Sequence, residues 1–154
     1  MKKIIFIIVI IGLALFWYSK KLPVDTPVGN ALEKKDLIVL NTPKANDVIK
    51  SPLVIEGQAR GYWFFEASFP IVLTDWDGKI IAEHYAEAQG EPARTTDGVQ
   101  SGGWMTEDFV PFKSTLTFTA PAGNNKRGFL ILKKDNPSGL PEHDDALEIP
   151  VTFE

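Results

Sequence analysis

A chain of 154 residues without cysteine has room for one domain of ordinary size, and it can hold neither a disulfide nor a zinc–thiolate site. The formal net charge of −4 is a poor match for polyphosphate, so nucleic acid is not an expected partner. The 10 Phe, 4 Trp and 3 Tyr residues, with 11 prolines, are typical of a protein built from strands and turns.

Residues 1–21 have the pattern of a membrane segment. The run from Ile4 to Tyr18 is almost entirely apolar, and lysine pairs flank it at both ends. It is shorter than the roughly 20 residues that span a bilayer core. Lysine stems can snorkel, however, and Trp17 and Tyr18 lie where an interfacial aromatic belt would. We therefore expect an uncleaved anchor helix over 4–18.

The alternative for this segment is a cleaved signal peptide. Cleavage needs small residues directly after the apolar core, and Phe16, Trp17 and Tyr18 are bulky. The first small-x-small site, at 29–31, is too far downstream. The lysines on the two sides nearly balance, and the charged amino terminus favours an N-in orientation. We expect a single-pass protein of the cell membrane whose C-terminal domain is extracytoplasmic.

A polar stretch at 22–36 predicts a tether, and the folded domain is expected over 37–154. From residue 37 onward, short apolar or alternating runs are separated by turn residues. The predicted strands are 37–40, 53–59, 70–74, 79–85, 114–119, 129–132 and 147–153. Seven short strands predict an all-β fold, an immunoglobulin-like β-sandwich of about seven strands.

Three local signals refine this fold. Asp77-Gly78 between apolar runs predicts a tight hairpin, because glycine accepts a positive φ. Pro150 cannot donate to a strand ladder and so predicts an edge position or a bulge. Residues 87–103 are polar and predict a long surface loop, while Tyr62 to Ser68 is compatible with one helical turn.

The segment 59–70 carries five aromatic residues within eight positions. One interpretation is a corner that plugs the end of the sandwich, with Arg60 paired to Glu66; this is favoured because aromatic residues are mostly core. The other is an exposed patch that binds a partner or a glycan. Both stay open at this stage. The candidate interaction residues, from this and two later segments, are Arg60, Tyr62, Trp63, Phe64, Glu66, Trp104, Asn136 and Ser138.

Two later segments supply the remaining candidates. Residues 135–145 form a proline-rich and Asx-rich loop that is expected to be rigid, since Asx side chains cap their own backbone. The alternative is a calcium loop built from carboxylates, although the spacing does not match the 12-residue calcium loop. Those carboxylates are Asp135, Glu142, Asp144 and Asp145. In the segment 102–112, Phe109 and Phe112 are expected to seal the core while Trp104 is exposed near the first aromatic segment.

The sequence lacks the common catalytic motifs. There is no Gly-x-Ser-x-Gly elbow, no phosphate-binding glycine loop and no His-Glu-x-x-His, and His84 and His143 have no spaced partners. We therefore expect a binding or structural protein with no catalytic residues, cofactor or metal. A hydrolytic or metal-dependent enzyme remains the alternative, because distant carboxylates can converge in space.

Four stretches together resemble one known family. They are residues 59–70, Ser51-Pro52-Leu53, Asp77-Gly78-Lys79 and residues 133–139. They are similar to the immunoglobulin-like domain of bacterial sporulation and spore-germination proteins, which is often appended to a GerMN domain. The resemblance covers approximately 37–154. It implies an immunoglobulin-like sandwich in the cell envelope with a role in protein–protein contact, and it carries no catalytic residues.

The expected function is therefore that of a membrane-tethered extracytoplasmic module that contacts another envelope protein. The alternative is a domain that binds cell-wall glycan, because exposed aromatic rings stack on sugar faces. The candidates for that stacking are Trp63, Trp76 and Trp104.

Overall fold

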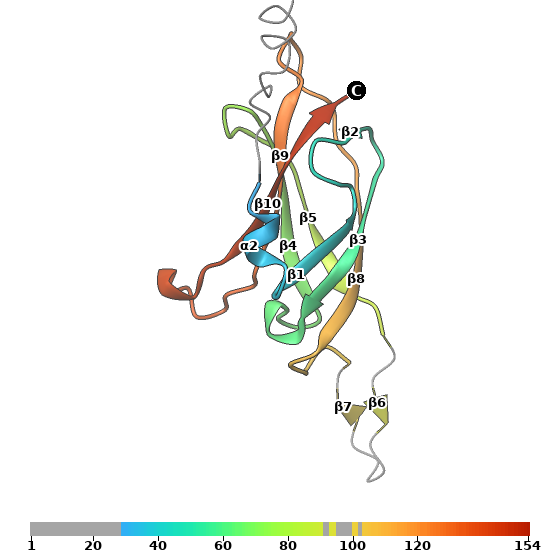
Figure 1. Ribbon diagram of the computed structural model, residues 1–154, viewed down its shortest axis with the longest axis vertical. Helices are drawn as coiled ribbons and strands as arrows, with labels where there is room; N and C mark the ends of the chain where they lie inside the picture. Colours follow the sequence, from blue (N-terminus) through green and yellow to red (C-terminus); the bar gives the residue numbers. More distant parts are fainter. Residues whose placement is uncertain (1–28, 91–92, 95–99, 102) are drawn as a thin grey trace, which may run out of the picture.

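The computed structural model describes residues 29–90, 93–94, 100–101 and 103–154 (Figure 1). The expected anchor, residues 4–18, lies outside this part of the chain. Within the described ranges, no helix has the length and apolar character needed to cross a membrane.

Eight strands form one sheet in the order β1-β3-β8-β5-β4-β9-β10-β2. Its neighbours pair antiparallel, except β10 and β2, which pair parallel. The strands are β1 (Ile38–Thr42), β2 (Val48–Ile49), β3 (Leu53–Arg60), β4 (Ser68–Asp75), β5 (Ile80–Ala88), β8 (Phe109–Leu116), β9 (Arg127–Lys133) and β10 (Ala146–Phe153). The helical elements are α2 (Ala31–Lys34) and two short 3-10 helices, η1 (Gly61–Trp63) and η2 (Pro141–His143).

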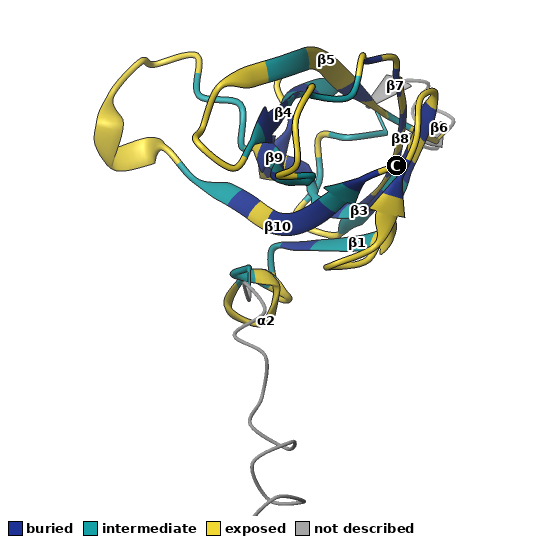
Figure 2. Ribbon diagram, turned by 90° about the horizontal axis from the view of Figure 1, so that it is seen from above, coloured by how far each residue is buried: buried dark blue, intermediate teal, exposed yellow. Residues whose placement is uncertain are grey.

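The sheet curls until its two halves face each other across a common core (Figure 2). Alternate residues of β3, β8 and β9 are buried, which is the period that a strand with one inward face requires. The all-β fold predicted from the sequence is confirmed. The facing halves belong to one continuous hydrogen-bonded sheet.

The predicted hairpin at Asp77-Gly78 connects β4 to β5. Gly78 has a φ of +81°. The carboxylate of Asp75 accepts the backbone N–H groups of Asp77 at 3.0 Å and Lys79 at 2.8 Å. An Asx side chain and a left-handed glycine thus fix the turn locally.

The strand predicted over 114–119 is displaced toward the N-terminus. Its inward phase is correct, because Leu116 and Phe118 are both buried, but β8 runs from Phe109 to Leu116. The first half of the strand was not predicted, because Pro111 is unfavourable within a strand. The carbonyl of Pro111 accepts the N–H of Gln89 at 2.7 Å, just after β5 ends, so its nitrogen also faces that side, and the missing N–H costs no hydrogen bond with β3.

The segment expected as one long loop, 87–103, also contains structure. β5 extends to Ala88, and beyond it β6 (Ala93–Arg94) and β7 (Gln100–Ser101) pair as a separate two-stranded sheet.

The edge position predicted for Pro150 is present. In β10, the backbone groups of every second residue, Glu148, Pro150 and Thr152, point away from β9. Pro150 accepts the N–H of Asn46 at 2.7 Å, and Thr152 donates to Asp47 at 2.9 Å. On this edge β2 pairs only with the last part of β10. The missing N–H of Pro150 therefore costs no hydrogen bond with β9.

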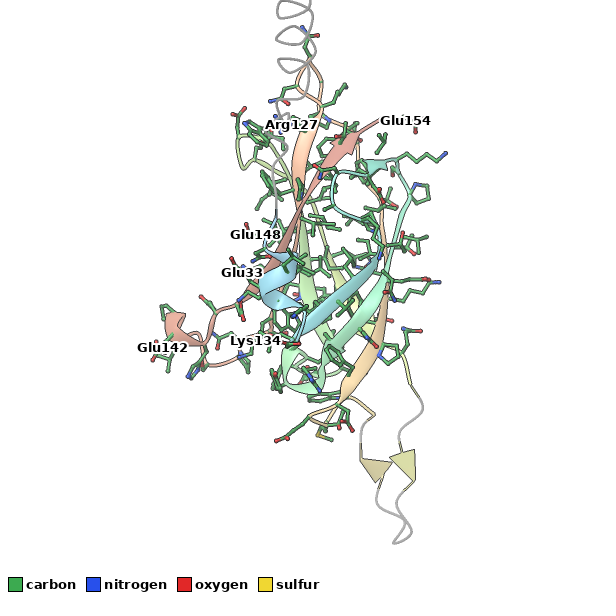
Figure 3. All side chains as sticks on the ribbon, in the orientation of Figure 1. Glu33, Arg127, Lys134, Glu142, Glu148 and Glu154 are labelled. Atoms are coloured by element: carbon green, nitrogen blue, oxygen red, sulfur yellow. The ribbon has the colours of Figure 1, made fainter. Side chains whose placement is uncertain are left out.

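Residues 29–36, which composition assigns to the tether, pack on the sheet. Asn30 bonds to the same outer edge of β10, and Lys34 of α2 forms an ion pair with Asp145. Figure 3 shows α2, marked by Glu33, next to Glu148 of β10. The folded unit thus includes Gly29 onward.

Candidate functional site

The aromatic corner, residues 60–68, connects β3 to β4. After η1, a two-residue turn returns the chain: Phe65 and Ser68 exchange backbone hydrogen bonds of 3.0 and 3.1 Å. Its central residues, Glu66 and Ala67, have φ values of 49° and 64°. This left-handed region costs a residue with a Cβ about 1–2 kcal/mol. The turn is therefore held by its surroundings rather than by local preference.

The corner divides its aromatic residues between the core and the surface. Trp63 and Phe64 are 0% and 4% exposed, whereas Tyr62 and Phe65 are 49% and 42% exposed. Phe64 packs edge-on against Phe69, with ring centroids 5.1 Å apart. The plug interpretation is correct for Trp63 and Phe64, and these two side chains are corrected from surface candidates to core residues.

Arg60 does not pair with Glu66, contrary to the expectation from the sequence. Its guanidinium donates to the carbonyl oxygens of Asp36 at 3.0 Å and Glu107 at 3.2 Å, and it lies 4.1 Å from the ring centroid of Phe109. Arg60 therefore links the corner to two neighbouring segments by hydrogen bonds. Glu66 is exposed at the turn.

Trp104 is half-buried against the core rather than exposed. The expectation that it lies near the first aromatic segment is correct. The carbonyl groups of Trp104 and Thr106 approach Gly61 so closely that a Cβ there would clash with backbone. Glycine at this position lets the two segments meet.

The loop after β9 is held by its own polar side chains, as expected. The amide nitrogen of Asn136 donates to the carbonyl of Leu140 and to the carboxylate of Asp144, both at 2.8 Å. Ser138 donates to Asn136 Oδ1 and accepts the N–H of Leu140 at 3.2 Å. Gly139 has a φ of +66°. The side chain of Asn136 thus bonds to three other residues of this loop.

Ser138 and His143 lie side by side but do not form a nucleophile and a base. Ser138 Oγ is 3.1 Å from His143 Nδ1. The serine has one proton, which it donates to Asn136 Oδ1, so Nδ1 of His143 must be the donor toward Ser138. A histidine that donates to the serine cannot take its proton.

Two of the carboxylates proposed for a calcium loop bond to other side chains. Asp144 accepts from Asn136, and Asp145 pairs with Lys34. Across the described residues, no group of three or more His, Cys, Asp and Glu side chains is arranged to hold a metal ion.

The aromatic corner and the loop after β9 meet at one hydrogen bond, from the N–H of Asp135 to the carbonyl of Trp63 at 3.0 Å. Between them is a shallow depression of about 410 Å³, here called the corner–loop hollow. It is lined by Tyr62, Phe64, Phe65, Lys134, Asp135, Asn136, Pro137, Ser138 and His143. In Figure 3 the loop projects sideways from the sheet, with Glu142 near its tip and Lys134 near its base.

The hollow gathers four of the eight predicted residues: Tyr62, Phe64, Asn136 and Ser138. The candidate list missed the other lining side chains; Phe65, Asp135, Pro137 and His143 lie in the two segments singled out, and Lys134 directly precedes the second. No periodic signal separates Phe65 from Phe64, since the turn rather than an alternating strand decides which ring faces outward.

The three tryptophans suggested for glycan stacking do not offer a free ring face together. Trp63 is buried and Trp104 is half-buried. Trp76 is 40% exposed, but Phe129 stacks on it at 5.5 Å and the guanidinium of Arg127 lies 4.2 Å from its ring centroid. These two contacts already use ring surface of Trp76 that a stacked sugar would need.

A second groove, of about 370 Å³, follows the seam between β1 and β10. Its lining is mainly aliphatic and includes Ile38, Leu40, Leu147 and Ile149. Exposed aromatic rings beside a rigid polar loop are found at the corner–loop hollow instead, and they make that hollow the candidate site.

Fold and site together define a small all-β domain with a candidate contact surface at one end of its sheet. Residues 37–139 match the model of a family described as an immunoglobulin-like domain of bacterial spore germination. The chain belongs to this family. The matched region contains the aromatic corner and the loop as far as Gly139. Searches of curated proteins and of solved structures found no match.

Proposed function

We propose that this chain is a germination-related contact module of the bacterial cell envelope, which binds another envelope protein through the corner–loop hollow. In this proposal residues 4–18 hold the module at the membrane, with the domain outside, and its role is binding rather than catalysis. The family supports a germination-related contact role.

The observation that carries the proposal is the pairing of two exposed aromatic rings with a rigid loop. Tyr62 and Phe65 are about half exposed, although the core lies directly beneath them. Aromatic side chains are enriched at the centres of protein interfaces, where they bury large areas with little loss of side-chain entropy. A loop already fixed by the hydrogen bonds of Asn136 lowers the cost of ordering on binding.

Site-specific photo-crosslinking in cells tests the contact. A photoreactive phenylalanine analogue replaces Tyr62 or Phe65 in the full chain, and Val54 of β3, which is 41% exposed, is the matched control position. We expect one discrete crosslinked protein from both hollow positions and none from Val54. Equal crosslinking at all three positions, or none at the hollow, contradicts the proposal.

Membrane attachment needs its own experiment. We expect the full chain to sediment with membranes after high-salt washing and a variant lacking residues 1–21 to be released. External protease added to cells without an outer barrier should digest the domain if it is extracytoplasmic. A full chain that stays in the soluble fraction, or is protected from that protease, contradicts this part of the proposal.

A further inference from the structure

The corner–loop hollow combines exposed aromatic rings with a carboxylate that has no partner. Asp135 lines the hollow and is half-buried. Its backbone N–H bonds to Trp63, but in the part of the chain that the structure describes, its carboxylate has no hydrogen bond or ion pair. Partly desolvated carboxylates are normally paired, so this group has capacity for a cation.

The charge around the hollow has the same sign. Asp135 lines the hollow, and Glu66, Glu142 and Asp144 are immediate chain neighbours of lining residues. Lys134 is a cation that lines the hollow. Its ammonium donates to the carbonyl of His143 at 3.4 Å, and no carboxylate among the described residues lies within 4.0 Å of it. With Lys133, which precedes Lys134, four acidic groups stand against two basic groups, and the excess of charge is negative.

The aromatic rings favour the same kind of guest. The faces of tyrosine and phenylalanine rings attract ammonium and guanidinium groups at distances up to about 6 Å. The described part of this domain makes such contacts itself, since Arg60 lies over Phe109 and Arg127 over Trp76. The long aliphatic stem of lysine or arginine can pack on apolar surface such as Pro137 while its charged end remains at the polar side.

We propose that the corner–loop hollow receives a lysine or arginine side chain from an extended segment of the partner protein. Asp135 supplies the opposite charge, Tyr62 and Phe65 supply ring faces, and the loop fixed by Asn136 holds these groups in place before binding. This inference rests on the proposed contact function and adds the chemistry of the segment that is recognised.

The test titrates the full chain, in detergent micelles, with three short peptides. They are acetyl-Ala-Pro-Lys-Leu-Ala-amide and the same peptide with norleucine or glutamate in place of lysine. Nuclear magnetic resonance follows the amide signals of Asn136, Ser138 and Phe65. We expect the lysine peptide to shift them saturably, and to bind about fivefold more weakly when salt rises from about 20 mM to about 500 mM. The norleucine and glutamate peptides should cause much smaller shifts.

Two variants with the same charge change separate the hollow from the overall field. Asp135→Asn should weaken the lysine peptide about fivefold. Asp77→Asn, in the hairpin at the other end of β4, should leave binding unchanged. Equal binding of the norleucine peptide would mean an apolar hollow and would overturn the inference, as would stronger binding of the glutamate peptide, no shift with any peptide, or an equal effect of both variants.

Crosslinking distinguishes failure of this inference from failure of the proposed function. If Tyr62 crosslinks a partner equally well in the wild-type and Asp135→Asn backgrounds, while the lysine peptide fails to bind, the contact function stands and the cationic guest is wrong. If no partner crosslinks but the lysine peptide binds as expected, the chemistry of the hollow stands and its assignment to an envelope protein is wrong.

Discussion

Asn30 replaces a neighbouring strand at the edge of β10 by bonding to both backbone groups of Glu148. Its side-chain oxygen accepts the N–H of Glu148 at 2.8 Å, and its own N–H donates to the carbonyl of Glu148 at 3.1 Å. Its side-chain nitrogen also donates to the carbonyl of Ala146 at 2.9 Å. One residue thus covers three polar groups on an exposed strand edge, which otherwise invites pairing with another chain.

The first prediction follows from this contact. Asn30→Ala removes two side-chain hydrogen bonds and should lower the free energy of unfolding by about 1–2 kcal/mol. Hydrogen exchange at the amide of Glu148 should accelerate as well. Asn124→Ala, in the exposed connection before β9, is the control and should change stability by less than about 0.5 kcal/mol. Unchanged exchange at Glu148 would show that the edge is covered by something else.

The second prediction separates core from surface in the aromatic corner. Trp63→Ala should cost about 3–5 kcal/mol in chemical denaturation, because it leaves a large cavity. Trp63→Phe should cost far less, because the buried indole N–H of Trp63 has no partner among the described residues and its loss relieves that penalty. Tyr62→Ala should stay within about 0.5 kcal/mol of wild type, as expected for a surface residue. A large loss from Tyr62→Ala would mean that the exposed ring supports the fold.

The third prediction concerns the left-handed turn. Ala67→Gly should stabilise the protein by about 0.5–1 kcal/mol, because glycine removes the Cβ clash at φ 64° and this gain exceeds its extra entropy when unfolded. The same substitution at Ala82, inside β5, should destabilise by about 0.5–1 kcal/mol. Thermal unfolding of both variants measures the contrast. Destabilisation at both positions would argue against strain in this turn.

The fourth prediction addresses the loop after β9. Asn136→Ala removes side-chain hydrogen bonds within the loop but no core contact, so global stability should fall by about 1 kcal/mol or less. Local order should fall more. Backbone amides of Gly139 and His143, which bond within the loop, should lose protection in hydrogen exchange while those of β9 keep theirs. Crosslinking from Tyr62 should weaken in parallel. Full protection of both loop amides would show that the backbone alone fixes the loop.

Short-range patterns in the sequence determined most of the strands, the hairpin at Asp77-Gly78 and the inward face of Leu116 and Phe118. They also identified the two segments that build the hollow and the family to which the chain belongs. These features depend on residues a few positions apart, where side-chain period and turn geometry decide the structure.

Only the tertiary structure decided which aromatic rings face outward, where Arg60 bonds, and that Trp63 and Asp135 meet. Asn30 and Glu148 are 118 positions apart, and no local sequence pattern predicts their contact. Such pairings depend on which edges and loops the curled sheet brings together. A polar backbone group takes whichever partner then lies within reach, so its choice is fixed only when the whole chain has folded.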